Sequence, residues 1–447
     1  KSDEGDWSEW ADGLPSQFLS KQSSSLAKRQ LNIAANDRYA EFDRICEITN
    51  PTIKKHLLKS FADDCDGAAV NLKAAALPGQ KYHAIIPINA LKDTEIYAPD
   101  YPDGSKLALV RYPHAGIFEI PILTVNNKNA AAKKILGKDI TDAVGITKAT
   151  ADQLSGADFD GDTVMCIPTN YGNVTIKSKP YLKELKGFDA KAEYGTYAGE
   201  NGDRYNFNGD KIRVMTKRDT QREMGVISNL ITDMTLSGGA TDEEMARAVK
   251  HSMVVIDAEK HKLDWKRSEA ENNIAELKRK YQRTVLPDGS IKTGGAATII
   301  SKAKSTERVP KRRGQAVIDK ETGAKSYKLA NADDLYYVER EYDKKTGIVT
   351  LRTTAGKKIQ YDSKDPVATE KYKPIRKFND DGTVYYTNKD GDISYRWRVR
   401  TQDSTKMAET DDARTLVSAS QHPMELIYAD YANSMKALAN RARKEMI

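Results

Sequence analysis

The chain has 447 residues, and its 71 lysines and arginines against 64 aspartates and glutamates give a formal net charge of +7 at pH 7. This length predicts about two to four domains, and the 39% hydrophobic content excludes a disordered chain. Because the net charge is mild, any contact with a polyanion must come from local basic patches. Three cysteines without a Cys-x-x-Cys pair argue against a disulfide scaffold or a zinc ribbon and predict a cytoplasmic location, and no apolar run approaches the length of a membrane span.

Residues 1–80 are predicted to form a helical N-terminal region. Ser16 and Pro51 are residue types that start helices, and Leu57, Leu58 and Phe61 give the second predicted helix an apolar stripe. The sequence begins with lysine rather than methionine, so we expect a processed chain or a piece of a longer one.

Residues 81–170 change to short apolar runs separated by proline and glycine turns. This pattern predicts a β-rich domain with the length of a compact barrel. The apolar runs occupy residues 84–88, 107–110, 117–120, 122–125 and 164–167.

Three aspartates, Asp158, Asp160 and Asp162, alternate just before the last of these runs. In an extended strand, alternate residues lie about 7 Å apart, which is too far for one ion, so the backbone must curl. Gly156 and Gly161 permit such a curl. Three carboxylates curled together repel one another unless a divalent cation lies among them, and a strand end would hold that cation still for phosphoryl or nucleotidyl transfer.

The aspartates also have two other interpretations. A solvated acidic turn explains the pattern equally well from the residues alone. A calcium loop of the EF-hand type also begins Asp-x-Asp-x-Asp, but its sixth and twelfth positions require glycine and glutamate. Here these positions hold Thr163 and Thr169, so a calcium loop is disfavoured.

The rest of the chain is predicted as a helical region over residues 171–283, a basic β-hairpin-rich domain over 284–403 and C-terminal helices over 404–447. Thr241 and Glu244 form a capping-box pattern in the first of these regions. The whole pattern predicts an α+β fold, in which a barrel core at 81–170 is flanked by helical segments, with a hairpin-rich insertion and a helical C-terminus.

The run Asp158-Phe159-Asp160-Gly161-Asp162 resembles the catalytic motif of the two-barrel RNA polymerases. That family includes the β′ subunit of cellular enzymes, the RNA-dependent polymerases of RNA silencing, and single-chain phage and prophage enzymes, to which the likeness is closest. Upstream, residues 110–117 (VRYPHAGI) resemble the Arg-x-Pro segment of the same barrel. The resemblance covers residues 81–170 and implies a double-psi β-barrel.

The resemblance also implies a function. The three aspartates would be catalytic and bind Mg²⁺, one of two Mg²⁺ ions used when an RNA 3′ hydroxyl attacks a nucleoside triphosphate. The chain would be the metal-binding barrel of a DNA-directed RNA polymerase, as a fragment or one subunit. The alternatives are an RNA-directed polymerase of the silencing type and a non-catalytic nucleic-acid-binding relative.

Partners implied by the resemblance are nucleoside triphosphates, a nucleic-acid template and the RNA product. A second, lysine-bearing barrel is expected on a missing N-terminal part or a partner subunit. Arg111 would contact the sugar or the transferring end of the substrate, or else form a surface ion pair. The β′ motif has asparagine where this chain has Gly156, so the resemblance does not explain ribose selection.

Two basic segments are candidates for contacts with substrate or nucleic acid. Lys217, Arg218 and Arg222 are predicted to bind substrate, and a solvated helix start explains them equally well. Residues 301–315 carry six basic residues and one acid, and are predicted either to bind nucleic-acid phosphates or to form a basic loop. The six are Lys302, Lys304, Arg308, Lys311, Arg312 and Arg313.

Two further segments show weaker likenesses to the same family. Asp257 and Lys260 fall in a short segment that resembles one of the silencing polymerases, although an apolar helix face followed by charges explains it as well. Lys406 and Met407 are, by position, candidates for the tip of a mobile nucleotide-sensing loop, for which the alternative is a plain linker.

Overall fold

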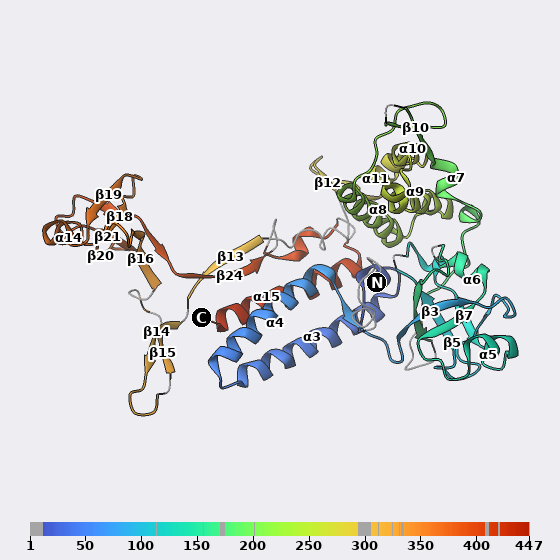
Figure 1. Cartoon of the computed structure of the whole chain (residues 1–447), viewed down its shortest axis with the longest axis horizontal. Helices are drawn as coiled ribbons and strands as arrows, with labels where there is room; N and C mark the ends of the chain where they lie inside the picture. Colours follow the sequence, from blue (N-terminus) through green and yellow to red (C-terminus); the bar gives the residue numbers. More distant parts are fainter. Residues whose placement is uncertain are drawn as a thin grey trace. The chain divides into compact units, whose positions relative to one another are not determined.

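The computed structural model describes residues 12–112, 114–154, 156–169, 175–200, 202–293, 305–311, 313–323, 325–329, 331, 335–406, 411–418 and 421–446. The chain divides into two compact units (Figure 1). Unit 1 comprises Lys1–Asp43, Asp64–Lys304 and Met407–Lys436, and unit 2 comprises Arg44–Asp63, Ser305–Lys406 and Ala437–Ile447. The fold is α+β, as predicted, and its long helices α3 (Ser24–Glu47), α4 (Pro51–Asn71) and α15 (Pro423–Glu445) have residues in both units.

A six-stranded sheet in unit 1 curls into a nearly closed barrel, with the strand order β4-β6-β5-β8-β3-β7. The pairs β3–β7 and β4–β6 are parallel and the others are antiparallel. Backbone hydrogen bonds between Tyr97 and Gly145 join the two edges of the sheet. The strands are β3 (Lys81–Pro87), β4 (Glu95–Ile96), β5 (Lys106–Val110), β6 (Ile122–Val125), β7 (Ala143–Ile146) and β8 (Thr163–Pro168).

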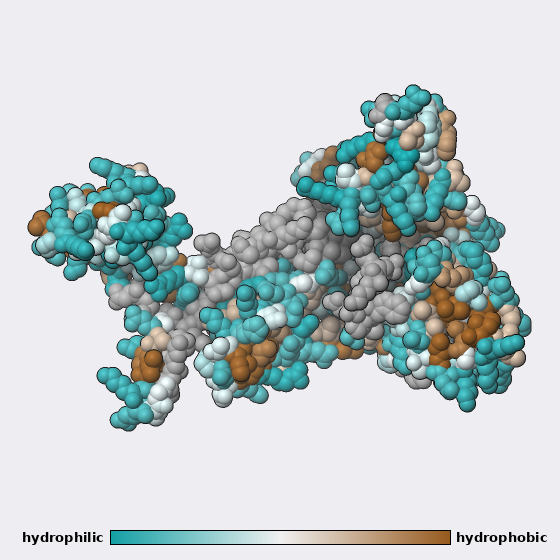
Figure 2. Space-filling view, viewed as in Figure 1, coloured by the Kyte–Doolittle hydropathy of each residue, from teal (hydrophilic) through white to brown (hydrophobic). Residues whose placement is uncertain are grey.

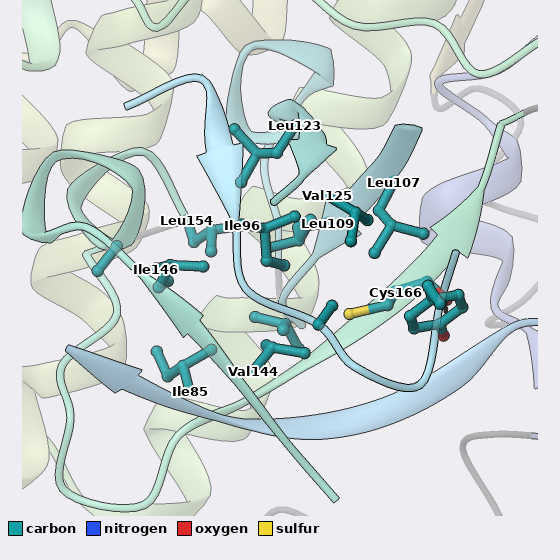
Figure 3. Packing of buried hydrophobic residues seen from close by; sticks show 14 of the residues in the cluster. Ile85, Ile96, Leu107, Leu109, Leu123, Val125, Val144, Ile146, Leu154 and Cys166 are labelled. Atoms are coloured by element: carbon teal, nitrogen blue, oxygen red, sulfur yellow. Dashed lines mark hydrogen bonds between the residues drawn. The ribbon is translucent and has the colours of Figure 1, made fainter. Parts of the chain in front are cut away.

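Apolar side chains from these strands fill the barrel (Figure 3). Strand β8 lies between β3 and β5 and is buried on both faces, which explains why its sequence is a continuous apolar run rather than an alternating one. Figure 2 shows apolar residues on the outside of this part of the molecule, where the large exposed apolar side chains among the described residues are Ile122 of β6 and Ile135 of the helix that follows it.

One predicted strand is wrong. Residues 117–120 form a 3₁₀ turn, η1 (Ile117–Glu119), between Gly116 and Pro121. The Glu119 carboxylate is buried and accepts a hydrogen bond of 2.6 Å from the Ala115 backbone N–H, and the Phe118 ring folds back over Gly116. A Cβ at Gly116 would lie 2.3 Å from that ring, so the turn requires glycine there.

Helices and short strands follow the barrel, and α8 packs against α9. Thr241 and Glu244 form the predicted capping box at the start of α9. No helix among the described residues is long and apolar enough to cross a membrane. The elements are η2 (Lys183–Leu185), α7 (Ala190–Tyr194), β9 (Thr196–Ala198), β10 (Arg204–Asn206), α8 (Lys217–Ser237), α9 (Asp242–His261), α10 (Trp265–Glu271), α11 (Ile274–Tyr281), β11 (Arg283–Val285) and β12 (Ile291–Thr293).

Unit 1 also contains several shorter elements. The helix expected at Ser16 has only four residues, because Pro15 precedes it and a turn follows at Ser20. These elements are β1 (Gly13–Leu14), α2 (Ser16–Leu19), β2 (Ala74–Ala75), α5 (Ala130–Leu136), α6 (Lys148–Gln153) and η3 (Ala413–Leu416).

Unit 2 contains the predicted hairpins around a small core of Val349, Leu351, Val384, Tyr386 and Tyr395. Where the sequence suggested a mobile loop or linker, residues 401–406 form a strand paired with β13, and Met407 lies outside the described residues. The elements are β13 (Ser305–Pro310), β14 (Arg313–Ile318), β15 (Lys325–Leu329), β16 (Tyr336–Val338), β17 (Arg340–Tyr342), β18 (Ile348–Arg352), β19 (Lys358–Asp362), α14 (Pro366–Tyr372), β20 (Ile375–Phe378), β21 (Val384–Thr387), β22 (Ser394–Tyr395), β23 (Trp397–Val399) and β24 (Thr401–Lys406).

The closure of the barrel at Gly145 gives the first testable prediction. A Cβ at Gly145 would lie 2.6 Å from the Ile88 side chain, whereas a Cβ at Gly67, within α4, would meet nothing within 4 Å. We expect Gly145→Ala to lower the free energy of unfolding by about 1–3 kcal/mol through overpacking. Gly67→Ala should raise it by up to about 1 kcal/mol, because alanine is the better helix former.

Denaturant unfolding, together with amide hydrogen exchange of β3 and β7, measures both effects. A Gly145→Ala variant as stable as the wild type would contradict the close approach of the strands at that point.

A buried histidine gives a prediction of how stability depends on pH. His251 in α9 is 3% exposed, and its Nδ1 shares a hydrogen bond of 3.0 Å with the Ser268 hydroxyl. Burial lowers the pKa of His251 to about 4, below its ordinary value of 6.5. As pH falls from about 6.5 to 4, the unfolded chain gains a proton that the folded chain does not, so stability falls, by up to about 3 kcal/mol.

The His251→Gln variant isolates this effect, because glutamine does not titrate. As pH falls through this window, the unfolding free energy of the wild type should decrease relative to that of the variant. A constant difference between pH 7 and pH 4 would contradict the neutral, buried state of His251.

Candidate metal centre

The three aspartates lie on the loop between α6 and β8, and the barrel core anchors this loop from one side. Ala157 is 2% exposed within the core, and Phe159 packs against it, whereas Asp158 and Asp160 are exposed. Gly156 and Gly161 have φ values of +66° and +129°. The backbone therefore curls at the two glycines, as the sequence predicted.

Hydrogen bonds within the loop draw the carboxylates together. The Asp158 backbone N–H donates to Asp162 Oδ2 at 3.0 Å, and the Asp160 N–H donates to Asp158 Oδ1 at 3.3 Å. One carboxylate oxygen from each aspartate lies within 4.8 Å of the others. The structure thus brings together all three aspartates that the sequence selected.

Strand pairing places Arg111 beside this cluster. In the antiparallel pair β5–β8, Val110 at the end of β5 is opposite Met165 near the start of β8. Arg111 follows β5 and Asp162 precedes β8, so their side chains meet, and Arg111 Nη2 donates to Asp162 Oδ1 at 2.9 Å. On the other side, the Ile85 N–H of β3 donates to the Asp162 carbonyl at 3.0 Å. Asp162 is 7% exposed and held from both neighbouring strands.

The two exposed carboxyl groups perturb each other. The hydrogen bond from Asp160 is the main reason that the pKa of Asp158 lies below its ordinary value, and the positive charges of Arg111 and Lys260 add to this shift. The same hydrogen bond, followed by the negative charge of Asp158, raises the pKa of Asp160. The pair therefore shares one proton more readily than two isolated aspartates would.

The donor set fits a small, hard divalent cation. Mg²⁺ prefers carboxylate oxygens at about 2.0–2.1 Å, so two oxygens bound to it lie about 3.0 Å apart when adjacent and about 4.2 Å apart when opposite. The carboxylate oxygens are within 4.8 Å of one another, so the exposed side chains of Asp158 and Asp160 would draw closer to Asp162 on binding one ion. A bound cation would also offset the mutual repulsion of the three carboxylates.

The cluster opens into a cavity of about 380 Å³, whose opposite wall is formed largely by α8 and α9. Lys260 and His261, at the end of α9, line the cavity together with the three aspartates and Arg111. Lys260 was singled out by only a short likeness in the sequence, and the structure places its charge near Asp158 and Asp160. The cavity therefore has three carboxylates on one wall, and Lys260 together with Asp257 on the wall formed by α9.

Three buried residues in the same cavity escaped the sequence analysis. Lys21 Nζ donates to the backbone carbonyls of Gln17 at 2.9 Å and His114 at 3.3 Å, and Glu119 lies nearby. Burial lowers the pKa of Lys21 to about 7, against the opposing charge of Glu119. Nothing in the local sequence signals this cluster, because Lys21 lies about 90 residues from its partner His114 in the chain.

The other predicted contacts lie elsewhere. Lys217 and Arg218 are exposed in the first turn of α8, and Arg222 pairs with Glu223 at 2.9 Å and Asp219 at 3.4 Å. None of these three is among the described residues that line the cavity, and their assignment to substrate stays a prediction.

The basic segment 301–315 is only partly described. Lys302, Lys304 and Arg312 lie outside the described residues, as do the side chains of Arg308 in β13 and Arg313 in β14. Lys311 is exposed between these two strands, and its backbone N–H donates to the Arg400 carbonyl at 3.1 Å. Its contact with nucleic acid stays a prediction.

Comparison with known proteins gives a distant likeness. No family model and no curated protein matches the chain. Ten chains of solved structures match, and among them is the RNA-dependent RNA polymerase QDE-1 from Thielavia terrestris, at 14% sequence identity and a TM-score of 0.36. The alignment covers 58% of this chain and 37% of the polymerase chain, so this chain spans little more than a third of that protein's length.

The geometry of the cluster predicts metal binding that depends on the three aspartates. We expect Asp160→Asn to weaken Mn²⁺ binding at least about tenfold, because the change removes one of three charged ligands. Electron paramagnetic resonance of free Mn²⁺ measures the affinity. The matched control is Asp152→Asn, at an exposed aspartate of α6 that pairs with Lys148. Equal affinities of the two variants would contradict a metal site at the aspartates.

Proposed function

We propose that this chain is the metal-binding catalytic part of an RNA polymerase, and that it transfers nucleotides to an RNA 3′ hydroxyl. The observation that carries the proposal is the gathering of Asp158, Asp160 and Asp162 within 4.8 Å at the wall of a cavity. The spacing of these aspartates resembles the catalytic motif of the two-barrel RNA polymerases, and they lie on a barrel, as that resemblance implies.

Bound Mg²⁺ would lower the pKa of the attacking hydroxyl and neutralise charge on the phosphate. The chain's own contribution is positioning. Asp162 is fixed by Arg111 and by the neighbouring strand β3, while Asp158 and Asp160 are exposed towards ligands in the cavity. A rigid ligand beside two accessible ones holds the ion in a defined place and leaves it open to substrate.

The cations of the cavity supply a second contribution. Arg111 lies beside the aspartates, and Lys260 approaches them from α9. Positive groups fixed in advance stabilise the charge that develops on a transferring phosphoryl group, without reorganisation during the reaction. In this proposal, Lys260 neutralises substrate phosphates, and Arg111 orients Asp162 and reaches the sugar or the transferring end.

The finer assignments are proposals of the same kind. We infer a DNA template first, with an RNA template as the alternative, and a lysine-bearing second barrel on another part of the protein or on a partner subunit. A non-catalytic nucleic-acid-binding relative is disfavoured, because it would keep the electrostatic cost of three clustered acids without using them. The likeness to prophage enzymes and the cytoplasmic location stay predictions.

Labelled ribonucleotide incorporation tests the function. The chain, alone and as the longest product of its gene, is incubated with Mg²⁺, the four triphosphates, and either single-stranded DNA or RNA. We expect template-dependent incorporation that Asp160→Ala reduces by at least about a thousandfold, with unchanged thermal unfolding. The control Asp152→Ala should retain wild-type activity.

The outcomes distinguish the alternatives. The preferred template identifies DNA-directed or RNA-directed synthesis, and activity in only the longer product places the second barrel outside this chain. No incorporation by either product, when metal and nucleic acid still bind, would point to a partner subunit that carries the second barrel or to a non-catalytic relative. Normal incorporation by Asp160→Ala would overturn the assignment.

A further inference from the structure

Three aromatic side chains are stacked on the surface of the β9–β10 hairpin in unit 1. The ring centroids of Tyr197 and Tyr205 are 6.0 Å apart, those of Tyr197 and Phe207 are 6.4 Å apart, and both interplanar angles are below 30°. Tyr197 is 46% exposed and Phe207 is 66% exposed. We call these three residues the aromatic ladder.

The hairpin sequence builds the ladder. Tyr197 and Tyr205 are directly opposite each other in the antiparallel register, and Phe207 lies just beyond the end of β10. Gly195 precedes β9, and a Cβ there would lie 3.4 Å from the Phe207 ring. The Phe207 ring therefore rests against backbone at Gly195 while most of its surface stays open to solvent.

The hairpin is fixed to the end of α9. The Thr196 hydroxyl donates to the Lys262 carbonyl, and the buried Asn206 side-chain amide donates to Asp264 Oδ2 at 3.0 Å. Lys260 and His261, just before these anchor points, line the cavity that contains the aspartates. Figure 1 shows β10 beside α10, which follows α9 in the chain. The ladder thus occupies a fixed position next to the wall of the candidate metal centre.

The charge around the ladder favours an anionic partner. From Arg204 to Arg218 the chain carries five basic residues and a single acid, Asp210. Arg213, Lys217 and Arg218 are exposed along this stretch. Lys211 forms an ion pair of 2.7 Å with Asp203 and Arg213 forms one of 3.5 Å with Asp219, so the positive excess is moderate.

A cross-strand aromatic pair can also serve only to stabilise a hairpin. That role explains why Tyr197 faces Tyr205, but it does not require the third ring. Phe207 lies outside the strand pair and is the most exposed of the three side chains. Exposed aromatic faces beside cations are the combination that binds bases and backbone of single strands.

We propose that the aromatic ladder binds single-stranded nucleic acid by stacking with its bases, at a strand that approaches or leaves the metal centre. This inference rests on the proposed function, because it takes the strand to be the template or the product of the polymerase. Stacking of this kind is independent of base identity, since every base has an aromatic face. It therefore suits a surface that must bind any sequence.

Fluorescence anisotropy with the full chain and a labelled 20-nucleotide oligothymidine tests the proposal. We expect Phe207→Ala and Tyr197→Ala each to weaken binding, by about five- to 150-fold for each base that loses its stacking partner. Phe207→Leu should lose affinity in the same way, and Phe207→Trp should keep it, because only tryptophan preserves an aromatic face. Thermal unfolding is measured on every variant, so a folding defect is recognised.

Two controls separate stacking from other effects. Tyr39→Ala removes an exposed tyrosine of α3 that lies between Asp37 and Glu41, and it should bind as the wild type does. An oligonucleotide of equal length without bases should bind wild type and Phe207→Ala equally, because only the phosphate contacts remain.

The results have definite meanings. Losses in the ladder variants that vanish on the strand without bases support the proposal. Unchanged affinity in Phe207→Ala and Tyr197→Ala, an equal loss on the strand without bases, or full affinity in Phe207→Leu would overturn it. Binding needs no catalysis, so a chain that binds through the ladder but whose Asp160→Ala variant incorporates nucleotides normally contradicts the proposed function alone. A chain that synthesises RNA with unaffected ladder variants contradicts the ladder alone.

Discussion

The arrangement of the candidate site depends on the mutual repulsion of three carboxylates on one short loop. Such a cluster forms only where the backbone is held from several sides, and the barrel provides this. Ala157 and Phe159 bind the loop to the core, Arg111 at the end of β5 pairs with Asp162, and β3 holds the Asp162 carbonyl. Because β8 pairs with both β3 and β5, its start is fixed on both sides, and the geometry of the aspartates follows from the sheet.

The same constraint explains which parts of the site could be predicted from sequence. The aspartates, the glycines that curl the backbone and the buried strand after them are adjacent in the chain, so their local chemistry was readable. The ion pair between Arg111 and Asp162 joins residues that only the pairing of β5 with β8 brings together, and Lys21 meets His114 across a similar gap. Sequence patterns of period two or 3.6 contain no information on such contacts.

The errors have local causes. Residues 117–120 have the composition of a buried strand, but the Glu119 carboxylate bonds to the Ala115 N–H and closes a turn. Residues 401–406 have the polar composition of a linker, yet their backbone pairs with β13, and polar side chains do not prevent such pairing. In both cases a specific hydrogen-bonding partner outweighed the average preference of the residues.

Helix α9, which follows the barrel in the chain, connects the cavity with the hairpin. Helix α9 brings Lys260 to the cavity and, just beyond its end, anchors the hairpin that carries the aromatic ladder. One helix thus connects a lysine of the cavity with the hairpin that carries the aromatic ladder. In the proposed function, this connection would hold a bound strand in register with the ion.

Anomalous diffraction from crystals soaked in Mn²⁺ tests the metal site directly, since it locates the ion without relying on activity. We predict an anomalous peak among the carboxylates of Asp158, Asp160 and Asp162, within direct bonding distance of an oxygen of each. Saturating Mn²⁺ that leaves no peak at these three aspartates would contradict the account, because the loop would then hold its carboxylates together for a reason other than metal binding.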